Sequence, residues 1–186
     1  MSDLQPLLSR ARDFAAWDTN PATRALHEAA AAYLAPSAAT SAAPAPRRPM
    51  SSPRADWDPA SLAASFGSPL EFGTAGLRGP MGAGSACMNE VTVMQAAQGI
   101  VAHLLATLPD AAARGLVVGY DHRALMGLTS RRFALLTAAA CAAKGVRVHL
   151  FRCLVATPLV PFAIRRLGAA AVRGKGRSTF AGPGIC

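Results

Sequence analysis

The sequence predicts an α/β protein: a three-layer α/β/α sandwich domain preceded by an N-terminal helical segment. The first observation is that short apolar strands alternate with helical patterns from about residue 70 onward, as in sheets covered by helices on both faces. The second is the length of 186 residues, which supports one domain of ordinary size. The third is the hydrophobic content of 52%, which is ample for a core although much of it is alanine.

Residues 1–35 are predicted to form a helical leader. Asn20 and Pro21 make a favourable helix start, because an N-cap side chain is followed by proline in the first turn. Residues 36–53 consist largely of Pro, Ala and Ser and cannot bury an apolar face. We therefore predict a disordered linker or surface insertion there.

The predicted α/β/α domain occupies residues 54–172. A short strand near Phe72 leads into a glycine-rich segment that ends near Gly84. Asn89 is then expected to cap a helix. The apolar positions of this helix recur at helical spacing, at Val93, Ala97, Ile100, Val101, Leu104 and Leu108.

A second strand is predicted over residues 116–120, where the sequence is short and apolar. Thr129 or Ser130 is expected to start the next helix, which runs to Lys144. Gly145 ends it, because glycine readily adopts the left-handed conformation found just after many helices.

A third strand is predicted over residues 146–151. Thr157 and Pro158 open another helix, which closes at Gly168. Residues 169–172 are a candidate for the start of one more strand, and residues 173–186 form a basic tail.

The net charge of +9 is unevenly distributed along the chain. After Asp121 there is no acidic residue, whereas eleven Lys or Arg lie between Arg123 and Arg177. A basic half of this kind indicates a nucleic-acid surface, a site for anionic substrates, or a piece separated from an acidic complement. Nucleic-acid binding is disfavoured, because the charges are scattered over predicted helices, strands and loops and few aromatic residues accompany them.

Neither a membrane span nor a secretory signal is predicted. The longest apolar run, residues 133–143, is far shorter than the roughly 18–20 residues that a spanning helix needs. The acidic residues Asp3, Asp13 and Asp18 near the N-terminus do not fit a targeting peptide. The four cysteines, Cys87, Cys141, Cys153 and Cys186, show neither CxxC pairing nor histidines at metal-ligand spacing. We expect reduced, buried thiols and a cytoplasmic location.

Three segments could carry chemistry. In residues 72–79 (Phe-Gly-Thr-Ala-Gly-Leu-Arg-Gly), the glycines permit a close approach of the backbone to a ligand, and the planar guanidinium group of Arg78 is suited to binding phosphate oxygens. The alternative is a glycine turn with a surface arginine. In residues 119–123, Asp121 could orient Arg123 or cap the following turn, and His122 is expected at the surface. The helix start at residues 157–158 is either an anion site or a plain cap.

The order of these segments resembles a known family. Residues 13–22, which contain Trp-Asp-Thr-Asn-Pro, resemble the leader of phosphoglucomutase/phosphopentomutase and glucose-1,6-bisphosphate synthase proteins. Residues 70–81 resemble their LEFGTAGLRG-x-MG segment almost letter for letter. Further matches follow in the family's order at Met88-Asn89, residues 95–99, residues 130–134 and Thr157-Pro158-x-x-Pro161-Phe162.

The resemblance implies the first of four α/β domains in a phosphosugar mutase, which is an isomerase of carbohydrate metabolism. In that family a phosphoserine of the first domain exchanges phosphoryl groups with a sugar phosphate, assisted by Mg²⁺ on the second domain and by glucose 1,6-bisphosphate. Arg78 matches the arginine that lines the family's active site, and we expect substrate binding at Thr74, Gly76, Arg78 and Arg123.

The sequence departs from the family pattern after Ala171. The family continues with an apolar strand and Thr-Ala-Ser-His-Asn-Pro, whereas this chain continues with Gly, Arg and Lys. Ser178 lies near the expected position of the nucleophile, but no strand holds it, so we interpret it as a decoy. Gly174-Lys175-Gly176 is not a P-loop, because its spacing and the residue after Lys175 are wrong.

These departures predict a fragment that is catalytically incompetent alone and binds neither cofactor productively. The family's metal-binding loop lies in its second domain, and the switch to a basic tail suggests a changed reading frame or an altered splice junction. One alternative is a non-catalytic module that binds phosphosugars or anions, or that pairs with a full-length mutase. A basic nucleic-acid-binding protein is a further alternative.

Overall fold

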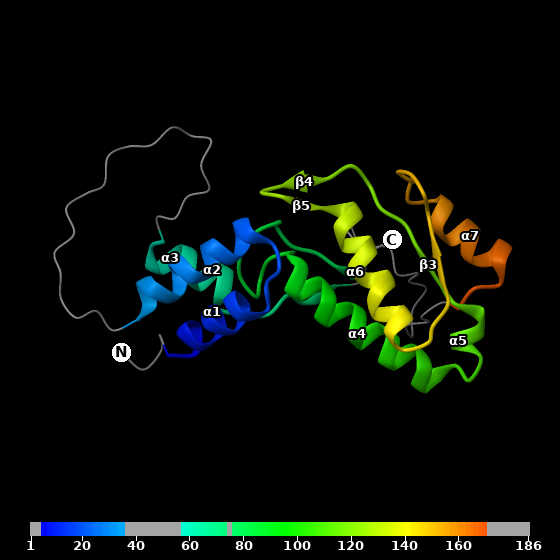
Figure 1. The fold of residues 1–186 in the computed structure, drawn as a ribbon, viewed down its shortest axis with the longest axis horizontal. Coiled ribbons are helices and arrows are strands. Elements are labelled where there is room, and N and C mark those ends of the chain that lie inside the picture. The colour runs from blue at the N-terminus through cyan, green and yellow to red at the C-terminus, as the bar shows by residue number, and fades with distance from the viewer. Residues whose placement is uncertain (1–4, 36–56, 74–75, 171–186) are drawn as a thin grey trace.

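The computed structural model describes residues 5–35, 57–73 and 76–170 (Figure 1). The predicted linker at residues 36–53 and the predicted tail at residues 173–186 lie outside the described residues. Within the described ranges, no helix is both long and apolar enough to cross a membrane.

Three helices form a bundle at one end of the molecule. These are α1 (Gln5–Trp17), α2 (Pro21–Leu34) and α3 (Pro59–Phe66). Asn20 caps α2 as expected, since its side chain accepts hydrogen bonds from the backbone N–H groups of Ala22 and Thr23. The buried residues shared by the three helices are Leu8, Ala11, Ala30, Leu34, Leu62 and Phe66. α3 therefore packs with the leader helices, although it lies in the segment predicted to open the α/β domain.

A small antiparallel hairpin links this bundle to the rest of the chain. It consists of β1 (Phe72–Gly73) and β2 (Gly76–Leu77), with Phe72 opposite Leu77. The predicted strand near Phe72 is thus half of a hairpin, and the glycine-rich segment follows the second half.

The α/β unit is built around two parallel strands. β3 (Leu116–Val118) pairs with β6 (Val148–Leu150), with Val117 opposite His149. The helices α4 (Glu90–Thr107) and α6 (Ser130–Ala143) pack together, and α7 (Leu159–Leu167) lies on the other side of the strands (Figure 1). A short helix, α5 (Ala111–Arg114), connects α4 to β3.

Alternation along β3 explains the layers. Successive side chains of a strand point to opposite faces. Val118 packs with Ala134 of α6, whereas Val117 packs with Val160 of α7. Helices therefore cover both faces of the strands, and the predicted α/β/α class is confirmed.

The ends of the helices match the sequence prediction closely. Asn89 caps α4 and Thr129 caps α6, each through a hydrogen bond from the backbone N–H three residues later. Gly145 and Gly168 follow α6 and α7 with positive φ angles of 71° and 62°. The exception is α7, whose N-terminus has no side-chain cap, so the predicted plain cap at residues 157–158 is not formed by a side chain.

Two details differ from the prediction. β4 (Ala124–Leu125) and β5 (Leu128–Thr129) form a hairpin that the sequence did not predict, because strands of two residues are too short to show an alternating pattern. Ala170 donates a hydrogen bond to the carbonyl of Gly115 (2.8 Å), but no strand begins at residues 169–170. Residues 171–172 lie outside the described part.

The cysteines are only partly buried as predicted. Cys87 and Cys141 are buried, but Cys153 is exposed, which corrects the expectation of buried thiols at that position. Cys153 lies in the loop between β6 and α7. Burial raises the pKa of the Cys141 thiol to about 11, so this side chain stays a neutral thiol near neutral pH.

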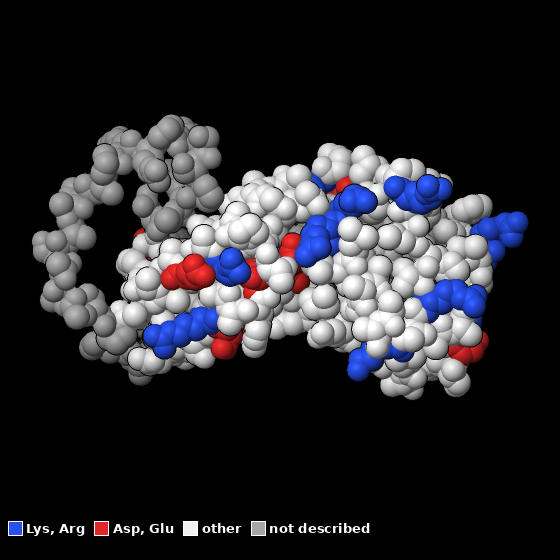
Figure 2. All heavy atoms as spheres, viewed as in Figure 1, with Lys and Arg blue, Asp and Glu red and all other residues white. Residues whose placement is uncertain are grey.

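Charge is distributed as unevenly in space as along the chain. On the face shown in Figure 2, most acidic side chains lie over the half of the molecule that contains the helical bundle. Lys and Arg predominate over the half that contains α6 and α7 (Figure 2). Described residues 122–170 contain no acidic residue, so the α/β unit presents a largely positive surface.

Candidate functional site

Arg78 directly follows the hairpin β1–β2, where the chain passes from the core to the surface. The preceding residue, Leu77, is buried with Leu128 of β5 and Phe133 of α6. Arg78 itself is exposed. A buried anchor followed by an exposed arginine fixes the base of the side chain and leaves the guanidinium group accessible to an anion.

The two other candidates in this segment have different outcomes. Gly76 is buried and has a φ of 98°, a conformation that favours glycine. Its assigned role in binding substrate stays a prediction, because a backbone conformation alone shows no ligand contact. Thr74 lies outside the described residues.

The side chain of Asn89 forms hydrogen bonds with the backbone of the glycine-rich segment. Its side-chain amide donates hydrogen bonds to the carbonyl oxygens of Gly82 (3.0 Å), Gly84 (2.8 Å) and Cys87 (3.3 Å). Its side-chain oxygen accepts from the backbone N–H of Thr92 at 3.0 Å. One fully buried side chain therefore caps α4 and also ties down the loop that precedes it.

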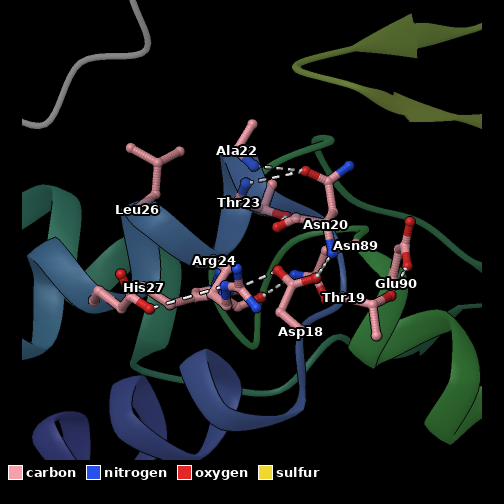
Figure 3. A network of polar contacts seen from close by, with 12 residues as sticks. Asp18, Thr19, Asn20, Ala22, Thr23, Arg24, Leu26, His27, Asn89 and Glu90 are labelled. Atoms are coloured by element: carbon pink, nitrogen blue, oxygen red, sulfur yellow. Dashed lines mark hydrogen bonds and ion pairs between the residues drawn. The ribbon is translucent and has the colours of Figure 1, made fainter.

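The leader contributes a second anchor to the same loop. The backbone N–H of Gly84 donates to Nε2 of His27 at 2.9 Å, and Nδ1 of His27 lies 3.2 Å from Oδ2 of Asp18 (Figure 3). Both side chains are fully buried. Burial raises the pKa of Asp18, but hydrogen bonds from His27, Thr23 and the Asn20 backbone outweigh it and hold the pKa below its usual range.

A third contact joins the leader to both large helices. Glu90, at the start of α4, is buried and accepts from Nε of Arg132 at 3.1 Å and Nη2 of Arg132 at 3.3 Å. The hydroxyl of Thr19 donates to the same carboxylate (Figure 3). The carboxylate is thus satisfied by three donors, and it ties the leader to α4 and α6.

The carboxyl end of β3 carries the second predicted segment. Asp121 accepts hydrogen bonds from Nε of Arg123 (2.7 Å), the backbone N–H of Arg123 (3.1 Å) and the hydroxyl of Ser130 (2.5 Å). Both predicted roles of Asp121 are therefore realised: it orients Arg123 and closes the turn. Burial raises the pKa of Asp121, but the hydrogen bonds from Ser130 and Arg123 outweigh it and lower the pKa overall.

The fold brings the Arg78 and Arg123 segments to one end of the α/β unit. Arg123 directly precedes β4, and Leu77 packs against β5 of the same hairpin. A Cβ atom at Gly82 would lie 3.8 Å from Cε of Met126, at the tip of that hairpin. In α/β proteins the carboxyl ends of parallel strands are the usual place for a ligand. The carboxyl end of β3, where the Arg78 and Arg123 segments meet, is therefore the candidate anion site.

The remaining predicted positions are less informative. His122 is exposed, as expected for a surface residue. Thr157 is exposed before α7, on the opposite side of the strands from α6. Ser178, the predicted decoy, lies outside the described residues.

The described residues do not provide a magnesium site. Within residues 5–35, 57–73 and 76–170, no three His, Cys, Asp or Glu side chains are grouped closely enough to hold a metal ion. Asp18, Glu90 and Asp121 are each already bonded to donors of the chain itself. A hard cation that prefers several carboxylate oxygens does not fit this arrangement.

Sequence reasoning missed two of the anchors. His27 and the pair Glu90–Arg132 gave no motif, because their partners lie 57 and 42 residues away in the chain. The one usable signal was the acidic residue directly after Asn89, which is favourable in the first turn of a helix. That signal predicts helix stabilisation but does not identify Arg132 as the partner.

Comparison with known proteins identifies the domain. Residues 69–172 match the family model described as phosphoglucomutase/phosphomannomutase, alpha/beta/alpha domain I. The probable phosphoribomutase of Schizosaccharomyces pombe is 52% identical over 102 residues, which cover 55% of this chain and 17% of that protein. The phosphopentomutase of Mus musculus is 46% identical, and the glucose 1,6-bisphosphate synthase of Homo sapiens is 47% identical, each over 104 residues with the same coverage.

The chain spans about 17% of the length of these curated relatives. No solved structure matches it significantly.

Proposed function

The chain belongs to the phosphoglucomutase/phosphomannomutase family, and from that premise we propose that its α/β unit forms the phosphate-binding side of the active site of a phosphosugar mutase. The observation that carries this proposal is the placement of Arg78, exposed on a segment whose backbone is held by Asn89 and His27. Phosphoryl transfer depends mainly on positioning and on cations arranged around a charged group.

Two arginines supply the charge at this site. Arg78 offers N–H groups that can bind two phosphate oxygens at once. Arg123 is held by Asp121, so its guanidinium group is oriented before a ligand arrives. A donor that is held in place before binding loses less conformational entropy on binding than a mobile one. Two arginine side chains at one site favour a doubly charged phosphate over a single carboxylate.

The substrate class proposed is a sugar phosphate or sugar bisphosphate. The relatives named above act as phosphopentomutase or glucose 1,6-bisphosphate synthase, and the reaction class would be an intramolecular phosphotransferase. In that reaction a bound Mg²⁺ would supply charge stabilisation of the transferring phosphoryl group. The residues of this chain contribute anion binding and orientation.

We propose that the 186-residue polypeptide assayed alone has no mutase turnover. The sequence contains no Thr-Ala-Ser-His-Asn-Pro segment, the segment that in the family holds the serine for in-line attack. Assays with glucose 1-phosphate and ribose 1-phosphate test this proposal. Robust turnover by the purified polypeptide would contradict it.

Arg78→Ala is expected to weaken binding of glucose 1,6-bisphosphate by about tenfold or more, because a hydrogen bond to a charged group contributes about 1.5–3 kcal/mol. Isothermal titration calorimetry measures the effect. Arg12→Ala is the matched control, since Arg12 is an exposed arginine of α1 in the helical bundle. Equal affinities for the wild type and Arg78→Ala would contradict the phosphate-binding role.

A second candidate function is docking onto a full-length mutase. α7 exposes Leu159 (49%), Phe162 (57%) and Leu167 (53%), beside a groove of about 490 Å³ that is lined mainly by apolar residues. Arg165 and Arg166 rim this face, and no acidic residue lies on the chain after Asp121. An exposed apolar patch with a single sign of charge fits a partner surface that is apolar and acidic.

Phe162→Ser tests this candidate. The substitution is expected to weaken a complex with a purified full-length phosphopentomutase by about tenfold or more, because large aromatic residues often dominate interface energies. Analytical ultracentrifugation measures the complex, and Tyr33→Ser on α2 (52% exposed) is the control. The docking proposal fails if the wild type forms no complex or if both variants bind equally well.

A further inference from the structure

We propose that Asp18 and His27 act as a positioning pair that fixes the backbone of Gly84 and thereby the glycine-rich segment that carries Arg78. The pair lies in the leader, outside the segment that matches the family model, and it reaches the loop across 57 residues of sequence. The inference rests on the proposed function, because it assigns the leader a role in positioning the backbone of the phosphate-binding segment.

The hydrogen bonds determine where the proton of the imidazole lies. The backbone N–H of Gly84 donates to Nε2 of His27, so Nε2 carries no hydrogen. The neutral ring must then carry its hydrogen on Nδ1, which faces Oδ2 of Asp18 at 3.2 Å. The other carboxylate oxygen of Asp18 accepts from the backbone N–H of Asn20 at 2.9 Å. Nδ1 of His27 and Oδ2 of Asp18 are both buried and lie beside each other as an ion-pair contact, although they do not meet the geometry of a hydrogen bond.

This pair resembles a catalytic dyad in composition but not in geometry. A general base needs an accessible nitrogen within reach of the proton that it removes. Nε2 of His27 is occupied by Gly84, and the ring is completely buried. The role that remains is to hold the Gly84 backbone in place.

Packing prevents the ring from turning away. His27 makes edge-on contacts with Phe14 of α1 and Phe66 of α3, with ring centroids 5.5 and 5.9 Å apart. Rotation of the ring would break both contacts and would bury a polar nitrogen against an aromatic face. The helical bundle therefore holds the imidazole in one orientation.

The anchor at Gly84 extends toward Arg78 through the loop backbone. Asn89 binds the carbonyls of Gly82 and Gly84, and the backbone N–H of Met88 donates to the carbonyl of Pro80 at 2.7 Å. Three alternate positions of the segment are thus fixed, and the first of them is two residues from Arg78. Loss of the Gly84 anchor would loosen the end of the loop farthest from that arginine.

Asp18→Asn separates this proposal from a general effect on folding, because it changes no volume. An asparagine amide presents one N–H₂ group in place of one carboxylate oxygen. If that group faces His27, the imidazole must accept on Nδ1 and carry its hydrogen on Nε2, where it meets the Gly84 N–H. If it faces the other way, it meets the N–H of Asn20. Either orientation sets two donors against each other.

The experiment uses the full chain and three measurements. In Asp18→Asn, nitrogen NMR of the His27 ring shows which orientation the amide adopts, because the Nδ1–H tautomer is lost if the N–H₂ group faces His27 and kept if it faces Asn20. Amide hydrogen exchange should accelerate by about tenfold, the change for loss of one ordinary hydrogen bond, at Gly84 in the first case and at Asn20 in the second. Affinity for glucose 1,6-bisphosphate should fall by a smaller factor when the Gly84 bond is lost, because Gly84 lies at the end of the loop farthest from Arg78. Asp13→Asn, an exposed position on α1 with the same change in charge, should alter none of these.

A rescue variant keeps the proposal testable if Asp18→Asn is poorly folded. His27→Gln places an amide oxygen near the position of Nε2, where it can accept from Gly84 without help from Asp18. The double variant Asp18→Asn/His27→Gln should therefore recover slow exchange at Gly84 and ligand affinity. Failure of this rescue, with circular dichroism showing intact helices, would overturn the positioning role.

The outcomes distinguish this inference from the proposed function. If Gly84 exchange accelerates while ligand affinity stays unchanged, and Arg78→Ala abolishes binding, the positioning role is wrong and the phosphate-binding role stands. If the wild type binds no glucose 1,6-bisphosphate, the proposed function fails, and the positioning role that depends on it fails with it. Unchanged exchange at both Gly84 and Asn20 in Asp18→Asn would by itself refute the tautomer argument.

Discussion

Replacing Gly84 with alanine is expected to lower the free energy of unfolding by about 3 kcal/mol or more. A Cβ atom at this position would lie 2.8 Å from the carbonyl carbon of Ser65 and 2.9 Å from its Cβ. Backbone atoms cannot move aside as a flexible side chain can. Gly84 also has a φ of 112°, which side-chain-bearing residues rarely adopt.

Urea denaturation of the wild type and Gly84→Ala measures this effect. Gly145→Ala is the control, because Gly145 also has a positive φ (71°) but has no atom within 4 Å of an added Cβ. Its cost should be limited to the left-handed backbone conformation, about 1–2 kcal/mol. The steric argument is wrong if the two substitutions destabilise the protein equally.

Asn89→Asp is expected to destabilise the fold by about 3 kcal/mol at neutral pH, although aspartate is as good an N-cap as asparagine. The introduced carboxylate can still accept from Thr92. It cannot donate to the carbonyls of Gly82, Gly84 and Cys87, and it places a buried negative charge against all three. An ordinary cap substitution costs only about 1 kcal/mol.

The pH dependence of Asn89→Asp provides the check. The three carbonyl oxygens should raise the pKa of the introduced carboxyl in the folded state above its unfolded value of about 3.9. The folded state then binds the proton more tightly, so the penalty relative to the wild type grows as pH rises through this range and shrinks in acid. A penalty independent of pH would refute the charge argument. Thr129→Ala, which removes only the α6 cap, should show no such dependence.

Helix boundaries were predictable from the sequence because the interactions that set them are local. Asn20, Asn89 and Thr129 each bond to backbone groups within three residues, so the identity of the cap and the periodicity that follows are sufficient. Gly145 and Gly168 are equally local signals at the other end of the helices. The α/β/α class followed from the same local elements and their alternation.

The candidate site was predicted less completely. Arg78 and Arg123 could be selected because glycine-rich and strand-end segments are typical places for anion-binding residues. The hairpin β4–β5, which brings the two segments together, was not predicted. Its turn is formed by Met126 and Gly127, both at positive φ (50° and 76°), and methionine is not a residue that signals such a turn.

By itself, the amino-acid sequence determined the ends of the main helices, the alternation of strands and helices, the excess of positive charge and the family of the domain, since each of these depends on neighbouring residues or on their order. Only the tertiary structure showed that His27 reaches Gly84, that Arg132 reaches Glu90 and that α3 packs with the leader. These contacts join residues far apart in the chain. The physical reason is that a buried polar group takes whichever partner the packed fold brings within hydrogen-bond distance, and no local pattern records which residue that is.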